Sequence, residues 1–390
     1  MPAVKCDIVI CGGGLAGLSL LYRAMKAGIW TNEQIIVVDR SDKQENDKTW
    51  SFWKTEDSVF EEIIHRRWKN LVFFSHEGQK IPLKNNGYTY NSIRSIDFYN
   101  YVLSYLKTFA NISFVQEEIL TITSSGKGCE LVTSLHTYHS TYLFNSIFKK
   151  PELPKGEQYF LQHFKGLRIR TKSAIPPLSD AYLMDFRTKQ DNGTTFFYTL
   201  PMAINEVFIE YTLFSKFVLP AEIYDQQLRI YLTAVLKIED YEILEEEFGV
   251  IPMTDHLFKR FEGNIIHIGT AGGDTRGSTG YTFTNVQKTI GKIIASFQSD
   301  QHPFFTAENI GLKAQLYDAT LLHVLAKEKY PGHQLFSDLF SKTPAYRIFA
   351  FLDAETSVIE DLHIMKSLRV LPFLQSFAIA LYNRFGSSKG

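Results

Sequence analysis

The sequence has little cysteine and almost no net charge. Its 390 residues include three cysteines and contain no C-x-x-C pair or His/Cys cluster, so we expect no metal site and a reducing compartment. The formal net charge of -1 gives no overall attraction to polyanions, so no nucleic-acid partner is expected.

Long apolar runs are absent as well. The uncharged stretch between Arg369 and Arg384 is shorter than the ~20 apolar residues of a membrane span. The first apolar run contains Asp7 and leads straight into glycines, which predicts a strand rather than a signal peptide. We therefore expect a soluble or peripheral protein.

Aromatic residues are plentiful. They make up 14% of the chain, with 31 Phe and 20 Tyr. They fit either a Phe-rich core or a large apolar cavity lined by rings, and composition leaves both open. The length allows two or three domains.

The first 40 residues carry a nucleotide-binding pattern. A strand is predicted over 4–11, a helix over 18–27 and a second strand over 34–38, with a G-x-G-x-x-G run from Gly12 to Gly17. Gly12 permits the turn, Gly14 allows a pyrophosphate to approach, and Gly17 lets helix and sheet pack closely. Asp39, 22 residues after Gly17, can accept hydrogen bonds from a ribose.

The rest of the chain predicts an α+β arrangement. We expect helices over 97–109 (N-capped by Asp97), 222–248, 283–298 and from 306 onward. Short strands are expected within 112–147, and an antiparallel sheet is expected from 166–171, 181–187, 194–200 and 206–212. A further strand is expected over 264–269, followed by a glycine loop. The fold class is thus α/β plus an antiparallel β domain. We assign residues 1–110 and 260–300 to a dinucleotide-binding domain, 111–259 to a substrate-binding sheet domain, and 301–390 to a helical region. The returning glycine loop favours FAD over NAD.

Several segments resemble boxes of the bacterial lycopene β-cyclases, a family of FAD-dependent carotenoid cyclases. Asp47-Lys48-Thr49-Trp50-Ser51-Phe52 resembles an H-x-W-x-F box, and Val207-Phe208-Ile209-Glu210-Tyr211-Thr212 resembles the catalytic L-[IV/L]-E-[DE]-T box. Residues 184–201, 251–253 and 277–281 match further blocks. The resemblance implies a Rossmann-type FAD domain of the glutathione-reductase/hydroxylase type, an inserted substrate sheet and a helical tail.

The sequence departs from the family pattern at three places. Lys48 replaces the histidine of the first box, and Tyr211 replaces the acid after the catalytic glutamate. Related flavoproteins often carry an aspartate directly after the return strand, whereas Asp274 comes later here. These changes leave the exact carotenoid substrate open.

The resemblance implies an isomerase (an intramolecular lyase) that cyclises lycopene ends to γ-carotene or β-carotene without net redox change. Glu210 is the expected catalytic acid/base, because an apolar cavity would keep it protonated. From position alone, Glu210 could equally be a strand glutamate paired with Arg or Lys. The flavin is expected to act in its reduced form, with NAD(P)H as the reductant.

The remaining site residues fall into two groups. The cofactor-binding group is expected to include Arg94, Gly269, Thr279 and Gly280. The substrate pocket is expected to include Trp50, Phe52, Asp185 and Tyr211. Domain packing for the aromatic residues and a surface ion pair for Arg94 remain alternatives.

A membrane-dissolved substrate requires contact with the bilayer. Residues 364–385 combine apolar positions with Lys366, Arg369 and Arg384 and no acid, which fits an interfacial helical segment broken at Pro372. A core helix of the tail fits equally. We expect a cytoplasmic protein, peripheral on the inner face of the plasma membrane, whose oligomeric state stays open.

The sequence also fits two alternative functions. An FAD-dependent monooxygenase or oxidoreductase acting on an apolar substrate would normally show an Asp-Gly motif, where this chain has Phe144-Asn145-Ser146-Ile147. An inactive flavin- or lipid-binding relative is the third possibility, and Tyr211 keeps it open.

Overall fold

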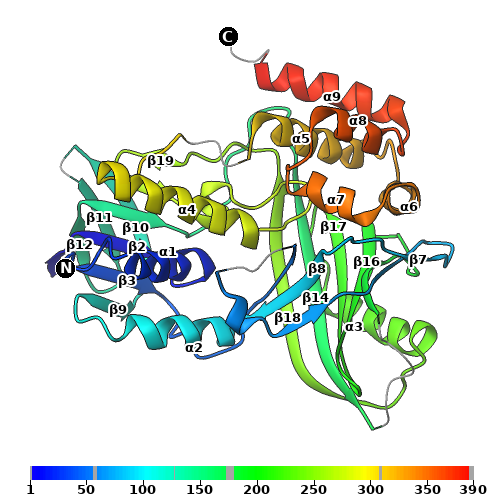
Figure 1. Cartoon of the computed structure of the whole chain (residues 1–390), viewed down its shortest axis with the longest axis horizontal. Helices are drawn as coiled ribbons and strands as arrows, with labels where there is room; N and C mark the ends of the chain where they lie inside the picture. The colour runs from blue at the N-terminus through cyan, green and yellow to red at the C-terminus, as the bar shows by residue number, and fades with distance from the viewer. Residues whose placement is uncertain (1, 56–58, 127, 173–179, 307–309, 386–390) are drawn as a thin grey trace.

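A parallel sheet forms one end of the molecule (Figure 1). The computed structural model describes residues 2–55, 59–126, 128–172, 180–306 and 310–385. The six strands of this sheet are, in spatial order, β19 (Phe261–Glu262), β20 (Ile265–His267), β13 (Tyr142–Asn145), β2 (Ile8–Cys11), β3 (Ile35–Asp39) and β9 (Ile112–Gln116). All neighbours pair in parallel except β19 with β20.

Strand β2 is apolar throughout because both of its faces are covered. Ile8 and Ile10 pack with the helices α1 (Leu15–Lys26), α2 (Ser95–Leu106) and α4 (Phe283–Asp300). Val9 and Cys11 pack against a second sheet on the other face. That sheet has the order β1 (Ala3–Lys5), β12 (Thr137–Ser140), β11 (Gly128–Thr133) and β10 (Ile119–Ser125).

The predicted strand over 4–11 is therefore two strands. β1 pairs with β12 and β2 pairs with β13, so the chain passes from one sheet to the other at Cys6 and Asp7. The Asp7 carboxylate accepts a hydrogen bond from the backbone N–H of Gln34 at 2.7 Å. It thereby ties this crossing to the start of β3.

A seven-stranded sheet forms the other half of the molecule (Figure 1). Its strands, in spatial order, are β18 (Tyr241–Thr254), β14 (Tyr159–Thr171), β17 (Glu206–Ser215), β16 (Thr194–Ala203), β15 (Ala181–Asp185), β6 (Leu71–Phe74) and β7 (Lys80–Pro82). The prediction of an antiparallel sheet over 166–212 is confirmed. Only the β15–β6 pair is parallel, so β6 and β7 join from an earlier part of the chain.

The prediction of helices over 222–248 is wrong in its second half. Only α3 (Ala221–Ile230) and the π-helical turn Tyr231–Val235 are helical, and β18 follows. β18 is an edge strand, where charged side chains are common because they discourage pairing with other chains. Its glutamates pair with basic residues of β14: Glu245 with Arg168, and Glu246 with Lys165.

Between the two large sheets lies a small three-stranded sheet. Its order is β4 (Thr49–Lys54), β8 (Thr89–Arg94) and β5 (Arg66–Trp68), and a 3₁₀ turn, Glu61–Ile63, precedes β5. Helix α2 follows β8 directly. It begins at Ser95 with Arg94 as the N-cap residue, so Asp97 is not the N-cap but lies in the first turn, where its charge favours the helix N-terminus.

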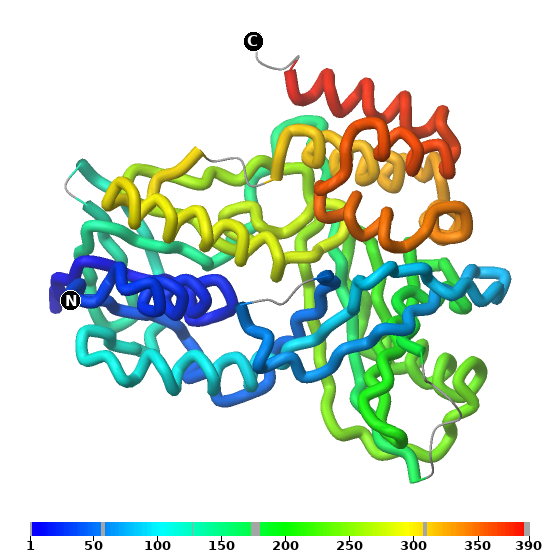
Figure 2. Tube along the Cα trace, viewed as in Figure 1, coloured from blue at the N-terminus to red at the C-terminus, as the bar shows by residue number. Residues whose placement is uncertain are grey.

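The described part of the C-terminal region is helical, as predicted, with α5 (Leu312–Ala326), α6 (Gly332–Lys342), α7 (Ala345–Leu352), α8 (Val358–Met365) and α9 (Val370–Phe385). Residues 307–309 and 386–390 of that prediction lie outside the described part. The chain does not break at Pro372, which sits in the first turn of α9, where its missing N–H costs nothing. The break falls between α8 and α9. The trace in Figure 2 shows this helical group at the end of the seven-stranded sheet, with α9 outermost.

The expected domain ranges stay a prediction, but strand pairing does not follow them. β9 to β13, expected in the substrate domain, pair in the sheets around β2. β6 and β7, expected in the dinucleotide domain, pair in the seven-stranded sheet. The sequence does not predict these pairings, because short strands of alternating polarity have similar sequences whichever sheet they join.

Candidate functional site

The glycine run follows β2 and opens α1, as the pattern predicts. Gly12 has φ +97°, a left-handed conformation that favours glycine. A Cβ atom at Gly17 would lie 2.0 Å from the Gly12 carbonyl oxygen, whereas one at Gly14 would have nothing within 4 Å. Gly17 therefore permits close packing, and Gly14 leaves the backbone open to a pyrophosphate at the helix N-terminus.

Asp39 ends β3 and faces the glycine loop. Its Oδ2 accepts from the Gly13 N–H at 2.7 Å, and its Oδ1 accepts from the Ser41 N–H at 2.8 Å and pairs with Lys43 at 3.0 Å. Oδ2 has a second lone pair, so the carboxylate can still accept from a ribose hydroxyl.

The return loop reaches the start of α1. It comprises the 3₁₀ turn Gly269–Gly272, and a Cβ at Gly269 would lie 3.0 Å from that of Ala16. The buried Asp274 accepts from the Gly269 N–H at 2.7 Å and pairs with Arg260 at 2.7 Å. Asp274 thus holds the loop together.

A cavity of about 120 Å³ lies between the seven-stranded sheet and the segment before α4. Its walls come from β4, β8, four strands of the large sheet and residues 279–283, and its lining includes Thr49, Trp50, Ser51, Tyr90, Gln162, Phe164, Tyr198, Leu200, Phe208, Glu210, Ile251, Thr279, Gly280, Tyr281, Thr282 and Phe283. Gly280 has φ +71°, and a Cβ there would lie 2.4 Å from Gln162 Oε1. The expected residues Glu210, Trp50, Thr279 and Gly280 are therefore brought together.

Glu210 faces this cavity from β17. Its neighbours Ile209 and Tyr211 point to the opposite face of the sheet, as strand alternation predicts. Burial raises the pKa of Glu210 to about 8, with the nearby Glu247 carboxyl acting in the same direction and a 2.6 Å hydrogen bond from the Thr212 hydroxyl opposing the shift. The Glu210 carboxyl is therefore largely protonated near neutral pH and can donate a proton.

Three tyrosines around Glu210 were not singled out from the sequence. The Tyr281 hydroxyl lies 3.4 Å from both the Tyr90 and the Tyr198 hydroxyl, and Tyr198 is the cross-strand neighbour of Glu210. Burial raises the pKa of each phenol, so all three stay neutral. Tyr198 and Tyr281 lie within the family-like blocks, but only the fold shows that Tyr90 joins them.

Phe52 and Arg94 lie near the cavity rather than in it. Phe52 stacks on Phe283, with ring centroids 4.2 Å apart, and so supports a lining residue. Arg94 forms a bidentate pair with Asp97 at 2.7 and 2.8 Å and lines a neighbouring cavity. Lys48 is exposed, and its backbone pairs with Ser95.

Tyr211 and Asp185 do not lie in the cavity, contrary to expectation. Tyr211 is buried between Phe197 and Tyr224 of α3, on the other face of the sheet. Asp185 pairs with Arg187 at 2.5 Å and accepts from the Tyr231 hydroxyl at 2.6 Å. Odd and even strand positions face opposite ways, so a residue beside Glu210 in sequence cannot share its face.

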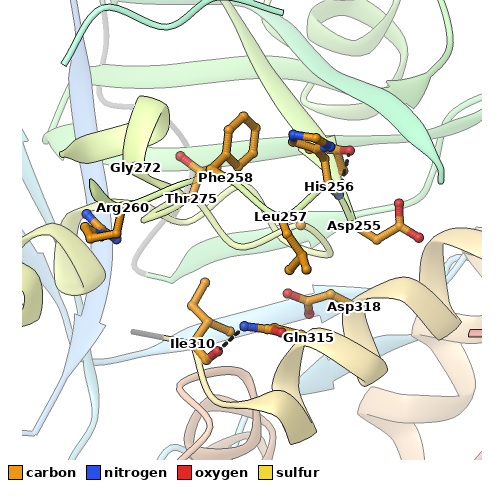
Figure 3. Close-up of a pocket in the computed structure, with 13 residues that line it drawn as sticks. Asp255, His256, Leu257, Phe258, Arg260, Gly272, Thr275, Ile310, Gln315 and Asp318 are labelled. Atoms are coloured by element: carbon orange, nitrogen blue, oxygen red, sulfur yellow. Dashed lines mark hydrogen bonds between the residues drawn. The ribbon is translucent and has the colours of Figure 1, made fainter. Parts of the chain in front are cut away.

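A separate polar pocket of about 100 Å³ borders the return loop (Figure 3). It shares no lining residue with the Glu210 cavity. Its charged groups are engaged with one another or with neighbours: Arg260 with Asp274, His256 with Glu157, and Asp318 with Arg276. This pocket therefore offers a weaker reactive site than the Glu210 cavity.

A model of the family described as lycopene cyclase protein matches residues 7–378, nearly the whole chain. The chain belongs to the lycopene cyclase family. The match includes the glycine run, the return loop and every lining residue of the Glu210 cavity. No curated protein matches the chain at a significant level.

Several solved structures are similar to this lycopene cyclase family member in fold. They include a flavoprotein/dehydrogenase from Cytophaga hutchinsonii (TM-score 0.61, 11% identity, 97% of this chain and 100% of that chain). Others are p-nitrophenol 4-monooxygenase PnpA from Pseudomonas putida (0.57, 12%, 97% and 99%) and halogenase PltM in complex with phloroglucinol and FAD (0.54, 12%, 98% and 92%). At these identities the likeness shows the fold alone, and it confirms the predicted hydroxylase-type fold with an inserted sheet and a helical tail.

Proposed function

We propose that this protein is an FAD-dependent lycopene β-cyclase that closes rings at the ends of a linear carotenoid without net redox change. The observation that carries the proposal is the position of Glu210. A carboxyl whose pKa lies near 8 faces a cavity walled by aromatic rings, as an acid that protonates a hydrocarbon requires.

The chain's own residues fit FAD. Gly12, Gly14 and Gly17 shape an open helix N-terminus for the pyrophosphate, and Asp39 lies where a ribose would be. Gly269, Thr279 and Gly280 would hold the flavin end, because Gly269 lies beside Ala16 of α1 while Thr279 and Gly280 line the Glu210 cavity. A bound reduced flavin would supply negative charge beside that cavity, and NAD(P)H is the proposed reductant.

Ring closure then needs only proton transfers. Glu210 donates its proton to the terminal double bond, the next double bond of the chain attacks the resulting cation to form the ring bond, and a different proton passes from the new ring to the Glu210 carboxylate. The product is an isomer of the substrate. The rings of Trp50, Tyr198 and Tyr281 line the cavity, and aromatic rings stabilise a cation through their negative faces.

A carotenoid must reach this cavity from a bilayer. Within the described residues, no helix is long and apolar enough to span a membrane. Helices α8 and α9 instead expose an apolar surface: Ile359 (69% exposed), Leu362 (54%), Leu371 (65%), Leu374 (60%), Ile379 (39%) and Tyr382 (71%). We propose that this surface, flanked by Lys366 and Arg369, rests on the inner face of the plasma membrane.

The proposal is tested by expression in a bacterium that accumulates lycopene. γ-Carotene or β-carotene is expected in the pigment extract, and Glu210→Gln is expected to abolish it while leaving the purified protein folded and flavin-bound. A hydroxylated product formed with matched NAD(P)H consumption would instead support the monooxygenase alternative. A protein with no affinity for FAD would overturn both.

A further inference from the structure

A second carboxyl lies in the same row of the sheet as Glu210. Gly166 of β14 pairs with Glu210 of β17 on one side and with Glu247 of β18 on the other. Residues paired across neighbouring strands share a face, so both carboxyls lie on the cavity side. Gly166 has no side chain, and the Phe208 ring covers it: a Cβ at Gly166 would lie 2.5 Å from Phe208 Cζ.

The spaces beside the two carboxyls adjoin. Glu247 lines a cavity of about 130 Å³ that shares Thr49, Leu200 and Phe208 with the Glu210 cavity. Phe208 thus borders two small compartments, one lined by Glu210 and the other by Glu247 together with Glu245 and Glu246. Two strand spacings, about 10 Å, divide the glutamate backbones, which is close enough for charge to be felt in a low-dielectric interior.

The two glutamates have different partners. Burial raises the pKa of the Glu247 carboxyl, as it does that of Glu210. Opposing this, the Thr49 backbone N–H donates to Glu247 Oε1 at 3.0 Å, and the nearby Lys48 also favours the ionised form of Glu247. Among the described residues, Glu210 accepts a hydrogen bond from the Thr212 hydroxyl and faces neutral phenols. Glu247 thus has more partners that stabilise a charge, so a single proton held by the pair is expected on Glu210.

Several other charged groups lie near Glu247, and its two arginines are each paired with an acid. The groups that face it are Lys48 and Asp47 before β4, Arg94 of β8, Arg168 of β14, and Glu245 and Glu246 of its own strand. Arg94 pairs with Asp97, and Arg168 with Glu206 and Glu245. Tyr90, Tyr198 and Tyr281 face Glu210, and no second charged side chain lines its cavity among the residues that the structure describes.

We propose that Glu247 is a positioning residue for the Glu210 proton. Its carboxylate keeps that proton on Glu210 and, through Thr49, anchors the first residue of β4, the strand that carries Trp50 into the cavity. This inference rests on the proposed function, in which protonated Glu210 is the acid.

The test is the pH profile of ring formation in Glu247→Gln. Removing a negative charge makes Glu210 easier to ionise, so the fall in activity with rising pH should move to lower pH by about one unit. Activity near pH 6 should match the wild type, and activity above pH 8 should be about tenfold lower. Glu247→Asp should restore the profile, and Glu242→Gln, on the same strand with its side chain 69% exposed, should not change it.

An unchanged profile in a folded, flavin-bound Glu247→Gln protein would overturn the inference, as would an equal loss of activity at all pH values. Should the wild type form no ring product, the proposed function fails and infrared spectroscopy still tests the pair. The carboxylic C=O band that Glu210→Gln removes should titrate at lower pH in Glu247→Gln than in the wild type. A band that titrates at the same pH contradicts the proposed role of Glu247.

Discussion

Opposing interactions determine the pKa of the Glu210 carboxyl. Burial and the Glu247 charge raise its pKa to about 8, while the Thr212 hydroxyl stabilises the ionised form. An acid that must be protonated to work loses activity as the pH rises through that value.

Replacing Glu210 by Gln should therefore lower the turnover number by about 10³-fold, a typical contribution of a positioned general acid. KM should change little, because the amide has the same shape. Steady-state rates of ring formation measure this, with Glu242→Gln as the control. A variant as fast as the wild type would remove Glu210 from the mechanism.

The same carboxyl affects stability in a predictable direction. Its folded-state pKa, about 8, exceeds the ordinary value of 4.5, so the neutral form favours folding and this stability is lost as the pH rises from 4.5 through 8. Glu210→Gln does not titrate. Its melting temperature should equal or exceed that of the wild type at pH 8.5, with a smaller advantage at pH 5, as thermal unfolding at both pH values would show. A greater advantage at pH 5 would contradict the shifted pKa.

Alanine substitutions at two glycines of the same motif should have different effects on stability and FAD binding. Gly17→Ala places a Cβ 2.0 Å from a backbone oxygen, so it should lower the melting temperature even of the flavin-free protein. Gly14→Ala meets no protein atom within 4 Å, so it should leave that temperature unchanged and weaken FAD binding at least tenfold. Calorimetry and flavin titration separate the two effects. Unimpaired FAD binding by Gly14→Ala would contradict the assigned nucleotide site.

Some helices and strands could be predicted from the sequence better than others. β2, α1 and β3 follow from buried apolar runs and glycines. Strand alternation predicts the face on which Glu210 lies, whereas its catalytic role is what the family resemblance implies. β18 was mistaken for helix because Glu245, Glu246 and Glu247 favour helices intrinsically, whereas pairing with β14 decides the outcome. Tyr90 and Glu247 could not be found, since Glu247 joins Glu210 through strand pairing, and Tyr90 through the packing of a second sheet, between distant parts of the chain.

The outer helices should determine membrane binding. Leu371→Asp with Leu374→Asp places two charges at positions that are 65% and 60% exposed in α9, so folding should be unaffected while binding to vesicles falls at least tenfold. Co-sedimentation with vesicles of anionic lipid measures this. Phe217→Asp, at a 77% exposed position outside these helices, is the control. Equal binding by all three proteins would exclude α9 as the contact surface.

Across the whole molecule, the parts of the site come from distant segments. The glycine run, the return loop and β17 are brought together by a parallel sheet, an inserted sheet and the strands between them (Figure 1). A ligand that binds only this folded arrangement should stabilise it. FAD at a hundred times its Kd should add about 2.7 kcal/mol to the free energy of unfolding, measurable as a rise in melting temperature. No rise with added FAD would contradict the assembled site.

The central claim is proton-initiated ring closure without net redox change. Conversion of lycopene by the reduced flavoprotein in D₂O tests it most directly, with the product analysed by mass spectrometry. The account predicts a cyclic isomer carrying one deuterium for each ring, because the added proton comes from an exchangeable carboxyl and a substrate proton is lost. A product that contains added oxygen, or a cyclic product without deuterium, would contradict it.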